Sequence, residues 1–207
     1  MIKLSILTPV WNQEELVIKG LDSIPRREDV EVIVCNDGST DGTLAALKEY
    51  AKTTDLNLTV LSNRKNKGVA ATANRLLAAA KGEWFHFLMS DDYLYTGKYN
   101  ALIDSLYGKN GEADVVCMDL IENSGAEYVL DSEKSGDYYC AQACRFIRKA
   151  FADGIKYPES KLVGEDADFH AELKARNPKI VYTKIAAYHY NYPRVGSLIY
   201  KHLRGEI

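Results

Sequence analysis

The chain of 207 residues carries 26 Lys and Arg against 29 Asp and Glu, which gives a formal net charge of −3. This balance argues against a basic nucleic-acid-binding surface, so no nucleic-acid partner is expected. The hydrophobic content of 46% is ordinary for a globular domain with a sizeable core. No apolar run approaches the ~20 residues that a membrane-spanning helix needs, and the first residues resemble a strand rather than a signal peptide. We therefore expect a cytoplasmic protein without a transmembrane segment, for which peripheral membrane association stays open.

The first half of the chain alternates strand and helix patterns. Strands are predicted from short apolar or alternating runs at residues 3–8, 31–35, 56–61 and 84–89. Helices are predicted between them at residues 13–24, from Thr43 past Ala51, and at residues 68–80. This order predicts an α/β fold, with a mostly parallel central sheet, right-handed crossovers and helices on both faces.

The second half of the chain is less regular. Its predicted elements are a helix at 99–106, a strand at 113–118, a polar hairpin or loop at 124–137, a helix at 138–152 and a loop at 154–161. The acidic run from Gly164 to Asp168 predicts the start of a helix that ends at Arg176. One or two strands at 179–190 and a surface helix in the tail complete the pattern. No repeat or linker divides the chain, so residues 1–207 are expected to form a single domain.

Two adjacent carboxylates follow the most apolar predicted strand. Asp91 and Asp92 come directly after it, at the strand end where parallel sheets bind ligands. Two ionised Asp side chains repel each other unless a cation or hydrogen-bond donors offset their charge. A hard divalent metal that also binds substrate phosphates would do this. The alternative is an Asp-rich loop or a helix cap without a ligand.

Polar loops follow all of the strands predicted in the first half, at residues 9–13, 36–43, 63–68 and 90–93. In a parallel sheet these loops lie along one edge. A dinucleotide-binding fold would need a glycine-rich turn after the first strand, and the run from Thr8 to Asn12 contains no glycine. A phosphate-binding P-loop is absent as well. The Asp pair with a metal is therefore the device we expect to hold phosphates.

The motifs at residues 5–12, 34–43, 66–68 with Asn74, 88–92 and 164–166 occur in an order and spacing that resemble the family-two glycosyltransferases of the GT-A fold. They extend over most of residues 3–190, and the run from Asn36 to Thr43 is the most specific of them. The resemblance implies a nucleotide-sugar-binding half at about residues 1–95 and an acceptor-binding, catalytic-base half at about 96–207. It also implies transfer of a sugar from a nucleotide-diphosphate donor, expected to be a UDP-sugar, to a glycan or lipid-linked sugar acceptor in polysaccharide biosynthesis.

Carried over residue by residue, the resemblance implies a donor site on these loops. Thr8, Pro9 and Trp11 would line the nucleobase pocket with Trp11 as the stacking aromatic, and Asp37 would accept a hydrogen bond from the base. The other implied donor-site residues are Asn12, Gly38, Lys67, Asn74, Ser90 and Asp91. The alternatives are a buried aromatic at a strand end for Trp11 and a turn-forming role for Asp37.

The resemblance also implies the catalytic groups. A divalent metal, Mn²⁺ or Mg²⁺, would bind Asp91 and Asp92, with His189 as a further ligand, and would stabilise the leaving diphosphate. Asp166, with Glu165 beside it, occupies the position of the general base that takes the proton of the acceptor hydroxyl. A single displacement would invert the anomeric centre. The alternatives are a helix N-cap for Asp166 and a structural histidine for His189.

Two positions depart from the family pattern. Met89 stands where an acidic residue is common, and Ala73 stands where the family often has Arg; Arg75 or Lys67 is a candidate to replace that Arg. These departures keep open a degenerate GT-A fold that binds a nucleotide or glycan without turnover. A nucleotidyltransferase is a further alternative, but the basic glycine-rich loop that it would need after the first strand is missing.

Overall fold

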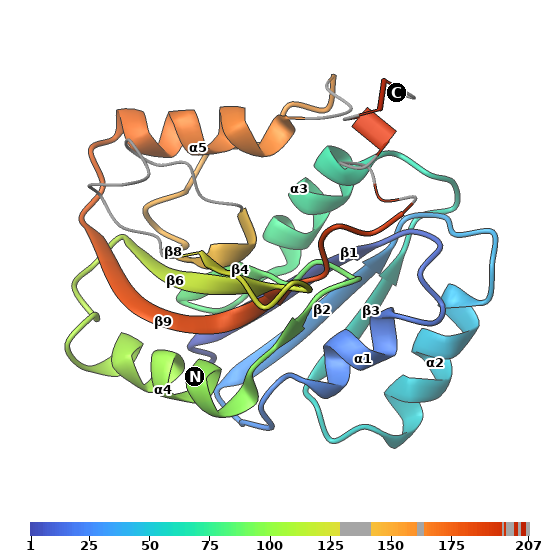
Figure 1. The fold of residues 1–207 in the computed structure, drawn as a ribbon, viewed down its shortest axis with the longest axis horizontal. Helices are drawn as coiled ribbons and strands as arrows, with labels where there is room; N and C mark the ends of the chain where they lie inside the picture. The colour runs from blue at the N-terminus through green and yellow to red at the C-terminus, as the bar shows by residue number, and fades with distance from the viewer. Residues whose placement is uncertain (129–141, 161–163, 196, 198–200, 203, 206–207) are drawn as a thin grey trace.

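A computed structural model describes residues 1–128, 142–160, 164–195, 197, 201–202 and 204–205. In this part of the chain, one sheet of nine strands is flanked by helices (Figure 1). The strands are β1 (Leu4–Val10), β2 (Val30–Asn36), β3 (Leu58–Ser62), β4 (Trp84–Phe87), β5 (Tyr93–Leu94), β6 (Val115–Glu122), β7 (Glu127–Tyr128), β8 (Arg145–Arg148) and β9 (Ile180–Tyr190). The helices are α1 (Val17–Asp22), α2 (Thr43–Thr53), α3 (Val69–Ala79), α4 (Thr96–Tyr107) and α5 (Glu165–Ala175), with a 3₁₀ turn at Gln142–Cys144.

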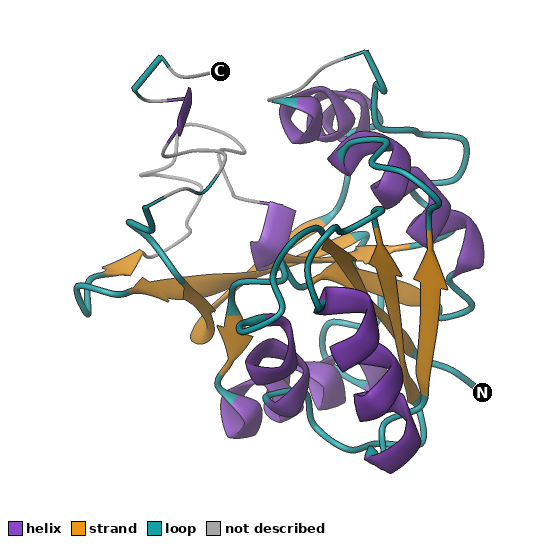
Figure 2. Cartoon of the chain, turned by 90° about the vertical axis from the view of Figure 1, so that its right-hand side faces the viewer, coloured by secondary structure: helices purple, strands orange, loops and turns teal. Residues whose placement is uncertain are grey.

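Strands β3, β2, β1 and β4 form the parallel part of the sheet. The chain steps outward from β1 to β2 to β3 and then returns to β4 on the other side of β1. Right-handed crossovers therefore put α1 and α2 on one face and α3 on the other. Figures 1 and 2 show this layering, with α4 on the side of α1 and α2 and with α5 on the side of α3. The predicted α/β architecture with helices on both faces is confirmed.

The rest of the sheet is mixed. Strand β8 runs antiparallel to both β4 and β6, and β9 runs parallel to β6 but antiparallel to β5. The purely parallel pairing that the first half of the sequence predicts thus ends at β4. Strand β9 is one continuous, strongly curved element of 11 residues (Figure 1), where the sequence left one or two strands open.

The helix predicted over residues 138–152 is wrong where the structure describes it. Strand β8 occupies the middle of this segment between β4 and β6, and Arg145, Phe146 and Ile147 are buried there. Its helix-like spacing was overridden because neighbours on both sides offered ladder hydrogen bonds and a buried position, and tertiary context outweighs local propensity. Residues 138–141 lie outside the described residues.

Other differences concern short elements and boundaries. Helix α1 covers only the centre of the segment predicted at 13–24, and the two-residue strands β5 and β7 were not predicted. Strand β7 pairs with β6, as expected for a hairpin after residue 124. The remainder of that hairpin and much of the predicted tail helix fall outside the described residues.

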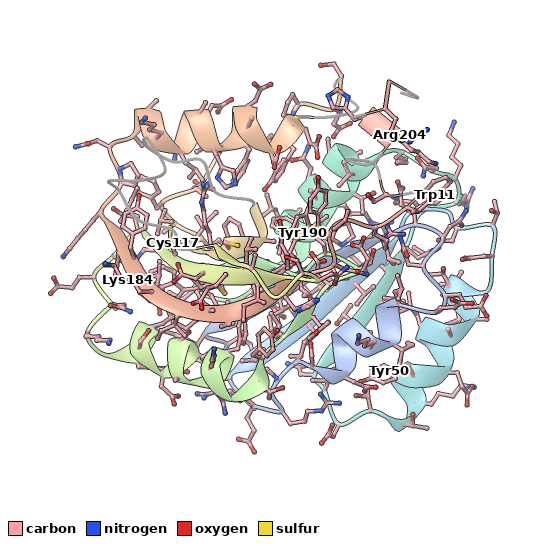
Figure 3. All side chains as sticks on the ribbon, in the orientation of Figure 1. Trp11, Tyr50, Cys117, Lys184, Tyr190 and Arg204 are labelled. Atoms are coloured by element: carbon pink, nitrogen blue, oxygen red, sulfur yellow. The ribbon has the colours of Figure 1, made fainter. Side chains whose placement is uncertain are left out.

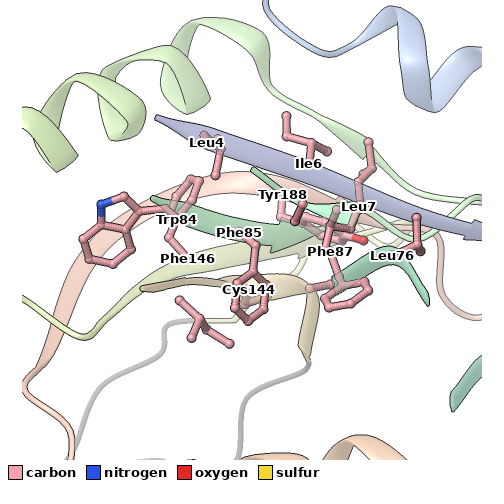
Figure 4. Close-up of a cluster of buried hydrophobic side chains, with 14 of the residues drawn as sticks. Leu4, Ile6, Leu7, Leu76, Trp84, Phe85, Phe87, Cys144, Phe146 and Tyr188 are labelled. Atoms are coloured by element: carbon pink, nitrogen blue, oxygen red, sulfur yellow. The ribbon is translucent and has the colours of Figure 1, made fainter. Parts of the chain in front are cut away.

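The core lies on both faces of the central strands. Every residue of β1, β2 and β4 is buried, as expected for strands that helices cover on both sides. Figure 4 shows one cluster, in which Leu4 and Leu7 of β1 and Phe85 of β4 lie near Phe146 of β8 and Tyr188 of β9. None of the helices in the described ranges has the length and apolar character needed to cross a membrane.

Candidate functional site

The loops after β1, β2 and β3 are joined by hydrogen bonds into one rigid edge. Asn12, at a φ of 52°, donates from Nδ2 to Thr40 Oγ1 (3.2 Å) and accepts at Oδ1 from the Thr40 amide (2.9 Å). The Asn12 amide donates to Ser39 Oγ (3.0 Å). In this arrangement Asn12 connects the first loop to the second, and its assignment to donor binding stays a prediction.

Asp37 is the buried centre of this edge. Its Oδ1 accepts hydrogen bonds from Asn63 Nδ2 (2.7 Å) and the Lys67 amide (3.0 Å), and its Oδ2 accepts one from the Gly68 amide (2.9 Å). The turn-forming role weighed for Asp37 is therefore real, because these bonds fix the start of α3. A carboxylate has about four acceptor positions, so one on Oδ2 remains for a ligand donor.

Gly38 lets the second and third loops approach each other. Its φ of 66° lies in the left-handed region, and a Cβ at this position would come within 2.4–2.6 Å of the backbone of Lys65 and Asn66. Only glycine tolerates both constraints. The structure thus gives Gly38 a packing role beside Asp37.

The predicted nucleobase residues differ in exposure. Trp11 exposes 48% of its surface beyond the end of β1 (Figure 3), which contradicts the alternative that it is a buried strand-end aromatic. Thr8 and Pro9 are buried within β1. Among the described residues, Thr8 Oγ1 is a buried hydroxyl oxygen without a hydrogen-bond partner. An exposed aromatic plane and an unpaired buried hydroxyl are groups that a ligand could satisfy.

Asp91 and Asp92 face different surroundings, although they are adjacent in sequence. The buried Asp92 accepts hydrogen bonds from the Tyr188 hydroxyl (2.5 Å) and the Asn191 amide (2.8 Å). Burial, followed by the charge of Asp91, raises the pKa of Asp92 to about 7. The partly exposed Asp91 instead forms an ion pair through Oδ2 with Arg194 Nε (2.9 Å) and Nη2 (2.7 Å).

His189 is held inside an aromatic stack. Its ring lies 4.0 Å from the ring of Tyr93, its Nδ1 is 3.1 Å from the Tyr95 hydroxyl, and its Nε2 is 2.9 Å from Asn123 Oδ1. Burial, and then the charge of Lys19, lower the pKa of His189. With both ring nitrogens engaged, His189 has the structural role that was the alternative to metal binding.

These positions bear directly on the predicted metal site. Within the described residues, no three or more His, Cys, Asp or Glu side chains come together as they would to hold a metal ion. The expected trio of Asp91, Asp92 and His189 is therefore not assembled, because Asp92 turns toward Tyr188 and His189 lies in its stack. Of this trio, Asp91 is the residue whose surroundings fit a metal, since a hard divalent cation can bind one protein carboxylate and take its other ligands from substrate phosphates and water. Ser90, just before it, is buried.

The acid pair predicted as catalytic opens α5. Gly164, in the left-handed conformation, is the N-cap, so Asp166 is not the cap residue. Asp166 Oδ1 accepts a hydrogen bond from the Ala167 amide (2.9 Å). Burial, and then the charge of Asp166, raise the pKa of Glu165. The positive end of the helix dipole favours carboxylates at this position.

Tyr157 connects the acid pair to the end of β4. Its ring stacks on Phe169 of α5 at 4.1 Å and meets Phe87, the last residue of β4, edge-on at 5.7 Å. Burial and then the charges of Asp166 and Glu165 raise the pKa of Tyr157 well above its usual value. Its buried hydroxyl has no hydrogen-bond partner in the described part of the chain.

Asn74 ties α3 to the segment that leads toward α5. Its Nδ2 donates to the Tyr157 carbonyl (2.9 Å) and to Glu159 Oε1 (3.2 Å), and its Oδ1 accepts from the Tyr157 amide (2.9 Å). The structure thus shows a bracing role for Asn74, and its role in donor binding stays a prediction. Lys67 is exposed beside this helix.

Sequence reasoning missed part of the network around the Asp pair. Asn191 donates from its amide to Asp92 and from Nδ2 to the Asp91 carbonyl (3.1 Å), while its Oδ1 accepts from Asn123 Nδ2 (2.8 Å). The ion pair between Arg194 and Asp91 was not expected from the sequence either. Polar residues just after a long strand were the only signal, because the pairing of β9 was not known.

Comparison with known proteins agrees with this arrangement. The family model described as glycosyl transferase family 2 matches residues 5–158. The minor teichoic acid biosynthesis protein GgaB of Bacillus subtilis is 27% identical over 93% of this chain and 23% of its own length. The poly(ribitol-phosphate) beta-glucosyltransferase of Bacillus spizizenii is 39% identical over 45% of this chain and 15% of its own length. The chain thus spans less than a quarter of the length of either relative.

Solved structures share the fold. The crystal structure of S. aureus TarS 1–349 in complex with UDP-GlcNAc superimposes with a TM-score of 0.79 at 25% identity, over 95% of this chain and 60% of that one. A complex of the same TarS fragment with UDP has a TM-score of 0.74 at 26% identity, over 92% of this chain and 60% of that one. The GT-A architecture expected from the sequence is confirmed.

Proposed function

Because the chain belongs to glycosyl transferase family 2, we propose that it transfers a sugar from a nucleotide-diphosphate donor to an acceptor hydroxyl, with inversion at the anomeric carbon. One observation carries the proposal beyond family membership. Tyr157 meets Phe87 at the end of β4 and stacks on Phe169 of α5, the helix that begins with the acid pair, which supports a position of Asp166 and Glu165 near the edge of the sheet where Asp91 follows β4. A base and a phosphate-binding carboxylate on the same side of the sheet are what such a transfer needs.

The donor is proposed to be a UDP-sugar. Support comes from the UDP and UDP-GlcNAc complexes of TarS, which shares the fold. In this chain Trp11 would stack on the base, the unpaired Thr8 hydroxyl would bind donor atoms, and the remaining acceptor position of Asp37 would take a base N–H. Stacking and one directed hydrogen bond together account for selection of a nucleobase.

A divalent metal, Mn²⁺ or Mg²⁺, would be held by Asp91. This carboxylate fits because it is partly exposed and because its present partner, Arg194, is itself a cation. When bound, the metal would supply Lewis-acid stabilisation of the leaving diphosphate. Asp92 would position the turn that carries Asp91, through its bonds to Tyr188 and Asn191.

Asp166 is proposed as the general base. Its Oδ1 already accepts the Ala167 amide hydrogen, so Oδ2 would take the proton of the acceptor hydroxyl as that oxygen attacks the anomeric carbon. Glu165 would lie beside it, with a pKa that burial raises first and the charge of Asp166 second. No carboxylate nucleophile is needed, because a single displacement completes the transfer.

The acceptor is proposed to be a polyol-phosphate chain. Curated relatives include a minor teichoic acid biosynthesis protein and a poly(ribitol-phosphate) beta-glucosyltransferase. TarS, 25% identical over 95% of this chain, carries the name poly(ribitol-phosphate) beta-N-acetylglucosaminyltransferase. A lipid-linked sugar acceptor is the competing assignment, because a further relative, 33% identical over 66% of this chain, is named for a GalNAc(5)-diNAcBac-PP-undecaprenol substrate.

Calorimetric titration of UDP, GDP and CDP, with and without Mn²⁺, tests the proposal. We expect UDP to bind most tightly in the presence of metal, and Asp91→Ala to remove the metal dependence. Asp166→Asn should keep nucleotide binding and lose about 10²–10⁴-fold in turnover, the usual contribution of a general base. Full turnover by Asp166→Asn would reject this residue as the base.

A non-catalytic binding subunit is the second candidate. Met89 stands where the family commonly has an acidic residue, and Arg194 forms an ion pair with Asp91. Tight UDP binding without hydrolysis or transfer of any UDP-sugar would favour it. If none of the three nucleotides binds under any of these conditions, the protein does not depend on a nucleotide in either candidate function.

A further inference from the structure

Strand β3 is an open edge of the sheet. It is the last strand on its side (Figure 1), and within the described residues it pairs only with β2. The segment Leu58–Ser62 contains neither a proline nor a charged residue, and it pairs with β2 without a bulge. Proteins usually protect an edge strand with a proline, a charge or a bulge, or by keeping it very short. The opposite edge strand, β5, has only two residues, so β3 is the edge open to a further strand.

The register with β2 shows which backbone groups of β3 point away from the sheet. The Val32 N–H donates to the Asn57 carbonyl (2.9 Å) where the pairing begins, and the Asn63 N–H donates to the Asn36 carbonyl (2.8 Å) where it ends. Neighbouring residues of a strand direct their N–H and C=O groups to opposite sides, so alternate residues from Asn57 to Asn63 bond to β2. The residues between them direct these groups outward, and they are Leu58, Val60 and Ser62.

Two of these outward groups already have a partner. The Leu58 N–H donates to the Leu56 carbonyl (2.8 Å), and the Ser62 carbonyl accepts a hydrogen bond from Arg75 Nη1 (2.9 Å). The Leu58 carbonyl, both groups of Val60 and the Ser62 N–H have no partner within the described residues. Along the strand these free groups are an acceptor, an acceptor with a donor, and a donor. This order is complementary to itself when the strand is reversed.

We propose that β3 pairs antiparallel with β3 of a second copy of this chain, about a twofold axis at Val60. In this register Val60 exchanges two hydrogen bonds with Val60 of the second copy. Each Ser62 N–H donates to the Leu58 carbonyl of the other copy, so all the free outward groups are used. A register shifted by two residues would oppose Val60 to a residue with only one free group, and fewer hydrogen bonds would form.

The charges at the two ends of β3 fit the same arrangement. Asp55 lies five residues before Val60, and Lys65 lies five residues after it. Antiparallel pairing therefore brings Asp55 of each copy to Arg64 and Lys65 of the other. Asp55 pairs with Arg26 Nε (2.9 Å) but keeps 74% of its side chain exposed, and both basic residues are exposed as well. Opposite charges thus meet at each end, which favours a second copy over an unrelated strand.

The pairing would also cover apolar side chains that the single chain leaves partly exposed. Leu58, Val60 and Leu61 are each only partly buried, and Val60 would face its own copy as a β-branched pair. Both copies use the same edge, so the association closes at a dimer. Because the paired strands are short, we expect a weak dimer that forms as the protein concentration rises. This inference does not depend on the proposed transfer reaction.

Sedimentation velocity of the full chain over a range of concentrations measures the dimer. Val60→Pro removes the central outward N–H and leaves the hydrogen bonds to β2 in place, since an edge strand tolerates proline where its N–H faces outward. We expect this variant to stay monomeric at concentrations at which the wild type dimerises. Thermal melting checks that it is folded.

A charge-reversal series tests the antiparallel register without touching the strand. Asp55→Lys should weaken dimerisation about tenfold, because it sets like charges together at both ends. Asp55→Lys/Lys65→Asp should restore dimerisation, because opposite charges then face each other again. Asp153→Lys is the matched control, since Asp153 is exposed, lies outside β3 and forms no ion pair within the described residues. It should dimerise like the wild type.

A wild-type chain that is monomeric at every concentration would overturn the proposal and leave the edge to a strand of a different protein. A dimer that neither Val60→Pro nor Asp55→Lys weakens would place the interface elsewhere on the molecule. If the double variant dimerises no better than Asp55→Lys, the antiparallel register is wrong. If Val60→Pro does not fold, the charge-reversal series decides alone.

Discussion

Asp91 and Asp92 show how two identical neighbours take different roles. Asp92 is buried and hydrogen-bonded to Tyr188 and Asn191, whereas Asp91 is partly exposed and paired with Arg194. The turn after β4 causes this separation, since its Asp92 amide bonds back to the Met89 carbonyl at 3.1 Å. One dipeptide therefore supplies a structural brace at Asp92 and, in the proposed function, the metal ligand at Asp91.

Arg194 and a divalent metal should compete for Asp91, because both need the same carboxylate. We expect Arg194→Gln to bind Mn²⁺ several-fold more tightly in the absence of nucleotide, as removal of a nearby cation lowers the repulsion that the metal meets. The measurement is a titration of free Mn²⁺ followed by electron paramagnetic resonance. Asp91→Ala is the control that should not bind Mn²⁺. Unchanged Mn²⁺ affinity in Arg194→Gln would show that the ion pair does not compete with the metal.

Tyr157→Phe separates a ligand-binding role from a structural one. The hydroxyl is buried without a partner in the described residues, so its removal should leave the free energy of unfolding unchanged or raise it by up to about 1 kcal/mol. Turnover should nevertheless fall if this hydroxyl binds substrate beside Asp166. Urea denaturation and steady-state kinetics measure the two effects. A less stable variant with normal turnover would show that the Tyr157 hydroxyl has a structural role and does not bind substrate.

At the scale of elements, the site depends on loops that pack backbone against backbone. The loop after β2 fits against the loop after β3 only because Gly38 lacks a side chain, and Asp37 then holds the start of α3. Helix α3 in turn holds the Tyr157 segment through Asn74. The donor loops and the Tyr157 segment are thus connected through one helix.

Gly38→Ala should destabilise the protein and weaken nucleotide binding together. Its φ of 66° and the approach of the new Cβ to within 2.4 Å of the Lys65 carbonyl carbon both oppose a side chain, at a cost of at least about 1 kcal/mol. Gly97→Ala is the matched control, because α4 has space for a Cβ there and alanine stabilises helices by about 0.5–1 kcal/mol. Thermal melting with and without UDP checks both. Equal effects of the two substitutions would contradict the packing argument.

At the scale of the whole molecule, a buried histidine in β4 links the stability of the fold to pH. His86 is fully buried, its Nε2 is 2.6 Å from the Ala143 carbonyl, and its Nδ1 is 2.7 Å from the Tyr99 hydroxyl. Burial lowers the pKa of His86 to about 4. The folded protein therefore keeps this ring neutral at a pH at which the unfolded chain would protonate it.

Because the pKa of His86 is lower in the folded state than in the unfolded chain, its contribution to stability is fully present above the unfolded pKa of about 6.5. This contribution is lost as the pH falls toward 4. At pH 5 the loss from His86 should be about 2 kcal/mol. His86→Gln should start from a lower stability and show a shallower decline between pH 7 and pH 5. Urea denaturation at a series of pH values measures this, and parallel curves for the two proteins would reject His86 as the source.

Local sequence determined the parallel half of the sheet and the loops that carry the candidate site. Short apolar runs and turn residues are properties of a few neighbouring positions, and alternation of strand with helix leaves only one sense of crossover. Asp37 and Asp91 could be picked out because each follows a predicted strand, whereas Asp166 lies at the start of a predicted helix and took its role from the resemblance. The motifs in these loops carried the resemblance to the family.

Only the tertiary structure decided which side chains contact the residues of the candidate site. Tyr188, Asn191 and Arg194 reach the Asp pair from about a hundred residues away, because β9 pairs with β5 beside it. Strand β8 replaced a predicted helix for the same reason, since a ladder partner on each side outweighed its local spacing. The direction, burial and ion pairing of these side chains depend on contacts between distant segments. No local pattern in the chain encodes those contacts.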